Sequence, residues 1–242
     1  TSREKVIFRT SDHGDLLGAH GGLHQKWFNL YDEATRVPFE IVKYGNGIGP
    51  RGIVDTVPTS HVDLIPTALA LAGLDPRELG QGLAPLFSEF HPLPGKDLSP
   101  LLADPEIEEF KDRAVYFMTR DNMLEGDTLA SGMARGLGKA DNPPRPLKIQ
   151  VPPHVSTNFE GIVVNIMDGE IPVMKSSLWK ITRAHDDPET WTIPNKANLS
   201  SSGAMGETYR TKTIPDQYEL YDLTNDPTES TNLWKEPKSN EV

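Results

Sequence analysis

Two residues that can bind a metal ion follow directly on a short apolar run near the start of the sequence. Residues 6–8 (VIF) are β-branched and aromatic, which predicts a buried strand, and the chain turns polar at residues 11–15 (SDHGD). The end of such a strand opens into the binding crevice of an α/β sheet. The Asp12 carboxylate and the His13 imidazole are good ligands for a divalent cation, although a full site needs about four to eight ligands. The alternative is a polar turn held by Asx hydrogen bonding, without a metal.

A glycine-rich loop with one lysine and two histidines comes next, at residues 18–27 (GAHGGLHQKW). Glycine lets the backbone approach a ligand closely. Lys26, just downstream of the Asp-His pair, can neutralise a sulfate or phosphate oxygen as a compact point charge. The competing interpretation is a solvated surface lysine in a loop whose histidines, His20 and His24, form local hydrogen bonds.

The composition excludes several classes of function. The net charge of −11 disfavours a nucleic-acid or anionic-membrane partner, and an anionic substrate would need a local cation. The sequence has no cysteine, hence no disulfide, thiolate metal site or cysteine nucleophile. Its most apolar stretch, residues 62–74, contains Asp63 and Pro66 and is too short to span a bilayer. These features predict a soluble protein, with the cytoplasm and the periplasm both open as its compartment.

The first half of the chain reads as strands and helices in turn. Residues 37–42 predict a second strand, and residues 27–34 a helical turn or two. Residues 60–72 give the best helix, with Pro66 in its first turn and Gly73 as its stop signal. This succession predicts an α/β layer with a partly parallel sheet over residues 1–110.

The second half, residues 111–242, has strand patterns without helices between them. Strands are predicted at residues 114–118, 161–166, 178–182 and 219–223, which indicates an antiparallel sheet in a second subdomain. Between them, residues 132–158 form a Pro/Gly-rich excursion expected to pack on the surface, and residues 198–206 (NLSSSGAMG) read as a loop.

Several segments together resemble the later part of the catalytic domain of the type I sulfatases, in the alkaline phosphatase superfamily. They are SDHGD, then LGAHGGLHQKWFNLYDEATRVPFEIV, then VPTSHVDLIPTALALAGL; residues 219–229 (ELYDLTNDPTE) with Asn232 and Leu233 are similar to the family's C-terminal signature. The resemblance is strong over residues 5–104 and 216–233. It implies the C-terminal portion of an alkaline-phosphatase-like α/β/α core in residues 1–110. A small α+β subdomain with an antiparallel sheet follows in residues 111–242, where the Asp226-Pro227 turn and Glu229 would cap a last hairpin or helix.

The resemblance also implies a chemistry: metal-assisted hydrolysis of a small-molecule sulfate ester, in the manner of an arylsulfatase. Asp12 and His13 match metal ligands, for Ca²⁺ first and Mn²⁺ or Mg²⁺ as alternatives. Lys26 matches the sulfate-binding lysine, and either His24, a weaker match, or a histidine further upstream would protonate the leaving group. Asp15 and His20 are expected to support the site rather than to contact the substrate.

The sequence departs from the family pattern in one respect. Sulfatases use a formylglycine made within a Cys/Ser-x-Pro-x-Arg motif, and neither this motif nor the family's early Asp-Asp pair occurs here. Both lie upstream of the SDHG segment in the family. We therefore expect the C-terminal part of a longer enzyme, inactive alone, whose remaining N-terminal part completes the site.

Two rival hypotheses stay open. A phosphonate monoester hydrolase or phosphodiesterase of the same superfamily also carries Asp-His at this strand end. A non-catalytic, degenerate fragment or binding module would use the same scaffold without chemistry.

Overall fold

The computed structural model describes residues 5–23, 26, 28–44, 52, 54, 57–105, 107–120, 156–168, 175–190, 197–198, 209–210 and 212–235. The strands are β1 (Lys5–Thr10), β2 (Phe39–Tyr44), β3 (Ala114–Arg120), β4 (Asn158–Asp168), β5 (Lys175–His185), β6 (Ala197–Asn198), β7 (Tyr209–Arg210) and β8 (Gln217–Asp222). The α-helices are α1 (Ala19–Gly22), α2 (Asp32–Thr35), α3 (Leu64–Leu71) and α4 (Pro76–Leu83). The 3-10 turns are η1 (His61–Asp63), η2 (Ala84–Leu86), η3 (Ser99–Leu102), η4 (Glu108–Phe110) and η5 (Pro188–Thr190).

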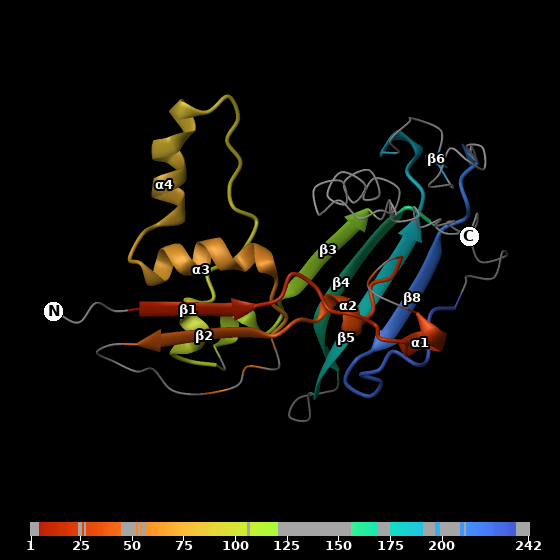
Figure 1. The fold of residues 1–242 in the computed structure, drawn as a ribbon. Helices are drawn as coiled ribbons and strands as arrows, with labels where there is room; N and C mark the ends of the chain where they lie inside the picture. Colours follow the sequence, from red (N-terminus) through yellow and green to blue (C-terminus); the bar gives the residue numbers. More distant parts are fainter. Residues whose placement is uncertain are drawn as a thin grey trace, which may run out of the picture.

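Strands β1 and β2 form a two-stranded antiparallel ribbon, with Lys5 opposite Tyr44 and Thr10 opposite Phe39. Helix α3 lies along the ribbon, and α4 projects away from it (Figure 1). The expected partly parallel sheet is wrong for the described residues, where every strand pair is antiparallel. A parallel pair needs a crossover across its own sheet. Among its described residues, the connection from β1 to β2 holds the four-residue helices α1 and α2, which lie against the other sheet instead (Figure 1).

The second sheet has four antiparallel strands in the order β3-β4-β5-β8, so the antiparallel sheet expected in the second half is confirmed. Helices α1 and α2 cover one face of it (Figure 1). Residues of that face are buried, among them Val115, Phe159, Lys180 and Tyr221. The α/β class expected from the sequence therefore holds, with antiparallel sheets.

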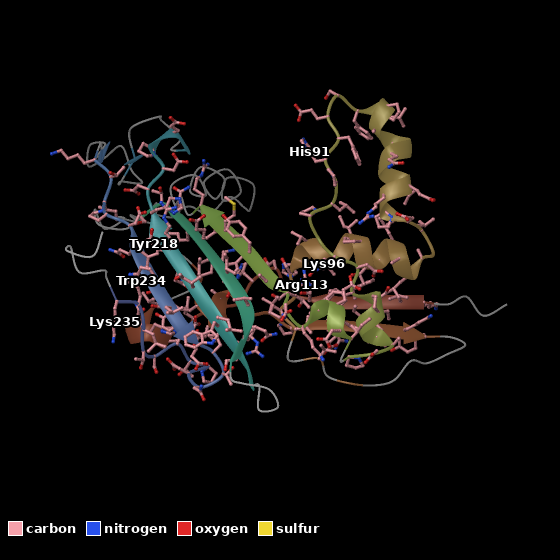
Figure 2. The ribbon with its side chains drawn as sticks, turned by 180° about the vertical axis from the view of Figure 1, so that it is seen from behind. His91, Lys96, Arg113, Tyr218, Trp234 and Lys235 are labelled. Carbon is pink, nitrogen blue, oxygen red and sulfur yellow. The ribbon has the colours of Figure 1, made fainter. Side chains whose placement is uncertain are left out.

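The opposite face of this sheet carries a network of charged and aromatic side chains. Arg183 on β5 bonds Glu160 on β4 at 2.9 Å and Asp216, before β8, at 2.8 Å. The hydrogen bond from Arg183 holds the pKa of Glu160 below its usual value. Tyr218 and Trp234 stack at 4.8 Å between ring centroids on the face that Figure 2 presents.

A buried carboxylate organises the start of α3. Ser60 and Asp63 form a capping box at η1, and α3 continues from it with Pro66 in its first turn, as the sequence predicts. Asp63 is fully buried and also accepts hydrogen bonds from Lys96 N at 2.8 Å and Arg113 Nη2 at 2.7 Å. Figure 2 shows Arg113 and Lys96 together beneath α3. Asp63 thus joins α3, the segment before η3, and the start of β3.

The neighbouring core follows from the same arrangement. Thr67 on α3 accepts a hydrogen bond from Leu98 N at 2.9 Å, which places Leu98 beside Leu101 and Phe110 in a buried apolar cluster. Gly73, at φ +75°, ends α3 in the left-handed conformation, as its predicted stop signal requires. Helix α4 is absent from the sequence-based expectations, although Asp75 at its N-cap and Pro76 at its first position are helix-start signals.

The remaining expectations fall partly outside the described residues. Most of the 132–158 excursion and residues 199–206 of the NLSSSGAMG loop lie there. Among the residues that the structure does describe, no helix has the length and apolar character needed to cross a membrane.

The buried Asp63–Arg113 pair gives a test of the fold. We expect Arg113→Met to lower the free energy of unfolding by about 3–5 kcal/mol, because it leaves the buried Asp63 carboxylate without its counter-ion. The matched control is Arg9→Met, which removes an exposed Arg–Glu40 pair and should cost about 0–1 kcal/mol. Denaturant unfolding of both variants measures the difference; equal losses would contradict it.

Candidate metal and substrate site

The Asp12–His13 turn begins two residues after Thr10, the last residue of β1. Ser11 Oγ donates to His13 O at 2.7 Å, and the Asp12 carboxylate accepts from His13 N at 3.0 Å. These local bonds hold Asp12 with 84% of its side chain exposed and bring its Oδ2 to 3.4 Å from His13 Nε2. The hydrogen bond from His13 N is the largest of the causes that lower the pKa of Asp12.

The donor atoms of this turn fit a divalent cation. His13 Nδ1 lies 2.7 Å from the carbonyl oxygen of Gly14, which can only accept, so we assign the ring proton to Nδ1. With the proton on Nδ1, a lone pair on Nε2 would face Asp12 Oδ2 at 3.4 Å, and one cation could bind both atoms. Among the described residues, no group of three or more His, Asp or Glu side chains lies close enough to hold a metal ion, so the pair alone does not make up a full ligand set.

Gly14 attaches the turn to α2. Its N–H donates to Ala34 O at 2.9 Å, and a Cβ at this position would lie 1.9 Å from the carbonyl oxygen of Glu33. Close backbone approach, rather than an unusual φ, explains why a glycine follows His13.

The loop after Gly14 is held by hydrogen bonds within it and by a contact between His20 and Glu33. Asp15 Oδ1 accepts from Leu17 N at 2.9 Å, and Gly18 N donates to Leu23 O at 2.8 Å. His20 has a φ of 51°, uncommon for a residue with a Cβ, and its Nε2 lies 3.0 Å from Glu33 Oε2.

Two side chains of the α2 segment, Tyr31 and Glu33, contact His20. The His20 ring stacks on Tyr31, with centroids 3.6 Å apart and planes at 4°. Burial acts to raise the pKa of Glu33, but hydrogen bonds, including that with His20, outweigh it and leave this pKa lowered. The sequence singled out His20 as a supporting residue; its partners Tyr31 and Glu33 were not foreseen, because nothing in their spacing marks them.

The structure places the other predicted residues as follows. Asp12 and His13 lie together, and Lys26 is half-buried at the end of the glycine-rich loop. His24 lies outside the described residues. A contact that the sequence did not indicate joins Thr10 Oγ1 and His61 Nε2 at 2.9 Å, which connects the end of β1 to the start of α3.

Comparison with known proteins concerns mainly this part of the chain. Residues 1–74 match the family model described as Sulfatase. The chain is 43% identical over 76 residues to the uncharacterized sulfatase YidJ of Escherichia coli, covering 31% of this chain and 14% of that protein. It is 38% identical over 78 residues to choline-sulfatase of Rhizobium meliloti, with the same two coverages. It is 43% identical over 74 residues to the low-salt glycan biosynthesis sulfotransferase Agl7 of Haloferax volcanii, covering 29% of this chain and 17% of that protein.

The matched region is a small part of each relative. The chain spans between about a seventh and a sixth of the length of these three proteins. Asp12, His13, Lys26, α2 and the start of α3 all fall within residues 1–74. The four-stranded sheet lies outside the segment that the family model covers.

The close approach at Gly14 can be tested by adding one methyl group. We expect Gly14→Ala to lower the free energy of unfolding by about 1–3 kcal/mol, because the Glu33 carbonyl must move away. Gly82→Ala is the control: it lies in α4 with nothing within 4 Å, and should raise stability by up to about 1 kcal/mol through helix propensity. Opposite signs in denaturant unfolding are the expected result; a stable Gly14→Ala protein would show that the approach is looser.

Proposed function

We propose that this chain, a member of the sulfatase family in the alkaline phosphatase superfamily, supplies one metal-binding corner and a sulfate-binding lysine to an enzyme that hydrolyses sulfate esters. The observation that carries the proposal is the exposed Asp12–His13 turn inside the matched segment. Its two free donor atoms lie 3.4 Å apart and are held there by local hydrogen bonds. The hydrogen bonds that close the turn run through Ser11 Oγ, Asp12 Oδ1 and the backbone, and neither Asp12 Oδ2 nor His13 Nε2 takes part in them.

Each residue has a definite part in the proposed reaction. Asp12 Oδ2 and His13 Nε2 would hold the cation, for which we propose Ca²⁺, with Mn²⁺ and Mg²⁺ as alternatives. A divalent ion bound there would neutralise charge on a sulfate oxygen. Lys26 would bind a second sulfate oxygen and stabilise the charge that develops on the leaving oxygen. His24 would donate the proton that the leaving group requires.

The nucleophile and the other metal ligands are proposed to come from the rest of the whole protein. A formylglycine is the expected nucleophile for this family, and no residue in this sequence stands in a Cys/Ser-x-Pro-x-Arg motif. The names of two relatives support a sulfate ester as the substrate class without defining which ester.

A second candidate has specific support from the third relative. Agl7 is named a sulfotransferase, which indicates that a similar 74-residue segment also occurs in a protein named for sulfate transfer. Transfer of sulfate to a hydroxyl acceptor differs from hydrolysis only in what receives the sulfate group. Hydrolysis remains the favoured proposal because the other two names are those of sulfatases.

The proposed metal site at Asp12 and His13 can be tested by measuring metal binding. We expect Asp12→Asn to weaken Ca²⁺ or Mn²⁺ affinity of the whole protein by at least the roughly 10–100-fold that loss of a supporting contact costs at metal sites. Isothermal titration measures it. The control, Asp75→Asn, alters another carboxylate, at the N-cap of α4, and should leave the affinity unchanged. Equal affinity in wild type and Asp12→Asn would remove Asp12 from the ligand set.

The reaction itself can be tested with a matched pair of substrates. We expect the whole protein to hydrolyse an aryl sulfate faster than the corresponding aryl phosphodiester, and Lys26→Ala to lower kcat/KM for the sulfate by about 10²–10³-fold. Lys111→Ala, which removes an exposed lysine paired with Glu108, is the control. Preference for the phosphodiester would support the phosphodiesterase alternative, and sulfate transfer to an added alcohol without hydrolysis would support the sulfotransferase.

A further inference from the structure

Lys180 is a buried cation that the proposed reaction does not use. It lies on β5, on the sheet face that α1 and α2 cover, and its side chain has no exposed surface. Its ammonium donates to Asp32 Oδ1 at 2.6 Å and to the carbonyl oxygen of Leu30 at 2.9 Å, and lies 2.7 Å from Glu229 Oε1. A fully buried ammonium requires such partners, because desolvation of an unpaired charge is costly.

Two of the three acceptors belong to one short segment of the N-terminal part. Leu30 and Asp32 stand at the entrance of α2, and Asp32 N also donates to Glu229 Oε2 at 2.6 Å. Lys180 on β5 and Glu229 in the turn after β8 therefore both bind the first turn of α2. Burial raises the pKa of Glu229, although the Lys180 ammonium acts in the opposite direction.

Glu229 is presented to α2 by a tightly bonded turn. Asp226 accepts hydrogen bonds from Ser230 N at 3.1 Å and Thr231 N at 2.9 Å. Glu229 lies inside the turn that these bonds close and has a φ of 50°. A left-handed conformation is unusual for glutamate and persists only where the surrounding structure holds it. The C-terminal signature residue thus reaches back to α2, rather than capping a last hairpin or helix as the family resemblance implies.

Helix α2 in turn supports both parts of the proposed site. Ala34 O accepts from Gly14, next to His13, and Tyr31 and Glu33 hold His20 in the loop that leads to Lys26. The Asp12–His13 turn and the Lys26 loop therefore share one support. That support is fixed to the rest of the described structure by a charge cluster centred on Lys180.

From these contacts we infer that Lys180 is a positioning residue. Through it, the C-terminal sheet fixes the position of the Asp12–His13 turn and of the loop that leads to Lys26. The inference rests on the proposed function for its catalytic meaning, but its structural content is independent of it. Loss of the ammonium should release α2 from the sheet. The His20 loop and the Gly14 turn should then lose their common support, while the sheet itself persists.

The test compares two cations on the same strand. Lys180→Met removes the buried ammonium; Arg183→Met, three residues along β5 and on the opposite face, removes an ion-pair network with Glu160 and Asp216. Two NMR signals of the 242-residue chain report on α2: the ring protons of His20, shifted upfield by the stacked Tyr31, and the hydrogen exchange of the Gly14 amide.

For Lys180→Met we expect loss of the His20 upfield shift and at least about tenfold faster exchange at Gly14, with protected amides retained in β3 and β4. Arg183→Met should leave both signals as in the wild type. If Lys180→Met alone does not fold, Lys180→Met/Glu229→Gln carries the test. It removes one unpaired carboxylate and keeps an oxygen acceptor for Asp32 N.

Unchanged His20 and Gly14 signals in a folded Lys180 variant would overturn the inference, as would equal changes in Arg183→Met. Neither signal depends on hydrolysis. Failure of the proposed function, seen as absence of sulfate-ester turnover by the whole protein, is therefore distinguishable from failure of this inference.

Discussion

The requirement that a buried ammonium be fully partnered governs much of this structure. Lys180 has no contact with solvent, and its three oxygen partners come from residues 30–32 and from Glu229. Satisfying this one charge brings together a strand of the C-terminal sheet, the turn after the last strand, and the first turn of α2. Once α2 is fixed, the Gly14 turn and the His20 loop have defined places against it.

A second buried charge acts in the same way on the other side of the molecule. Asp63 receives hydrogen bonds from Ser60 N, Lys96 N and the Arg113 guanidinium. It thereby fixes the start of α3 relative to the start of β3. His61, within the same turn, contacts Thr10 at the end of β1. The end of β1 and the Asp12–His13 turn are thus held at two places, by His61 at the start of α3 and by Ala34 in α2. A buried ion pair fixes each of these helices, Asp63–Arg113 for α3 and Asp32–Lys180 for α2.

This arrangement separates support from chemistry. The charges that hold the framework are buried and paired with one another, whereas Asp12 is exposed and its Oδ2 lies beside His13 Nε2. An exposed carboxylate beside an imidazole nitrogen has the donor atoms of a metal ligand pair. Such a pair gains its full meaning with the additional ligands proposed to lie in the rest of the whole protein.

The sequence by itself determined the local elements and the place of the Asp12–His13 turn after the first strand. Periodicity located β1, β2, α3 and the strands of the C-terminal sheet, and Pro66 and Gly73 marked where α3 starts and stops. The order of short segments in residues 5–104 and 216–233 indicated the resemblance to the sulfatases, and residues 1–74 match the model of that family. These features depend on the conformational preferences and hydrophobic spacing of residues that lie within a few positions of one another.

Only the tertiary structure decided the strand pairing and the partners of the buried charges. Periodicity shows which face of a strand is buried but not which strand lies beside it, so the antiparallel pairing of β1 and β2 was not foreseen. Asp63 and Arg113 are 50 positions apart, Asp32 and Lys180 148, and Asp32 and Glu229 197. In the sequence each reads as an ordinary surface charge, because its burial depends on chain segments far away that fold over it.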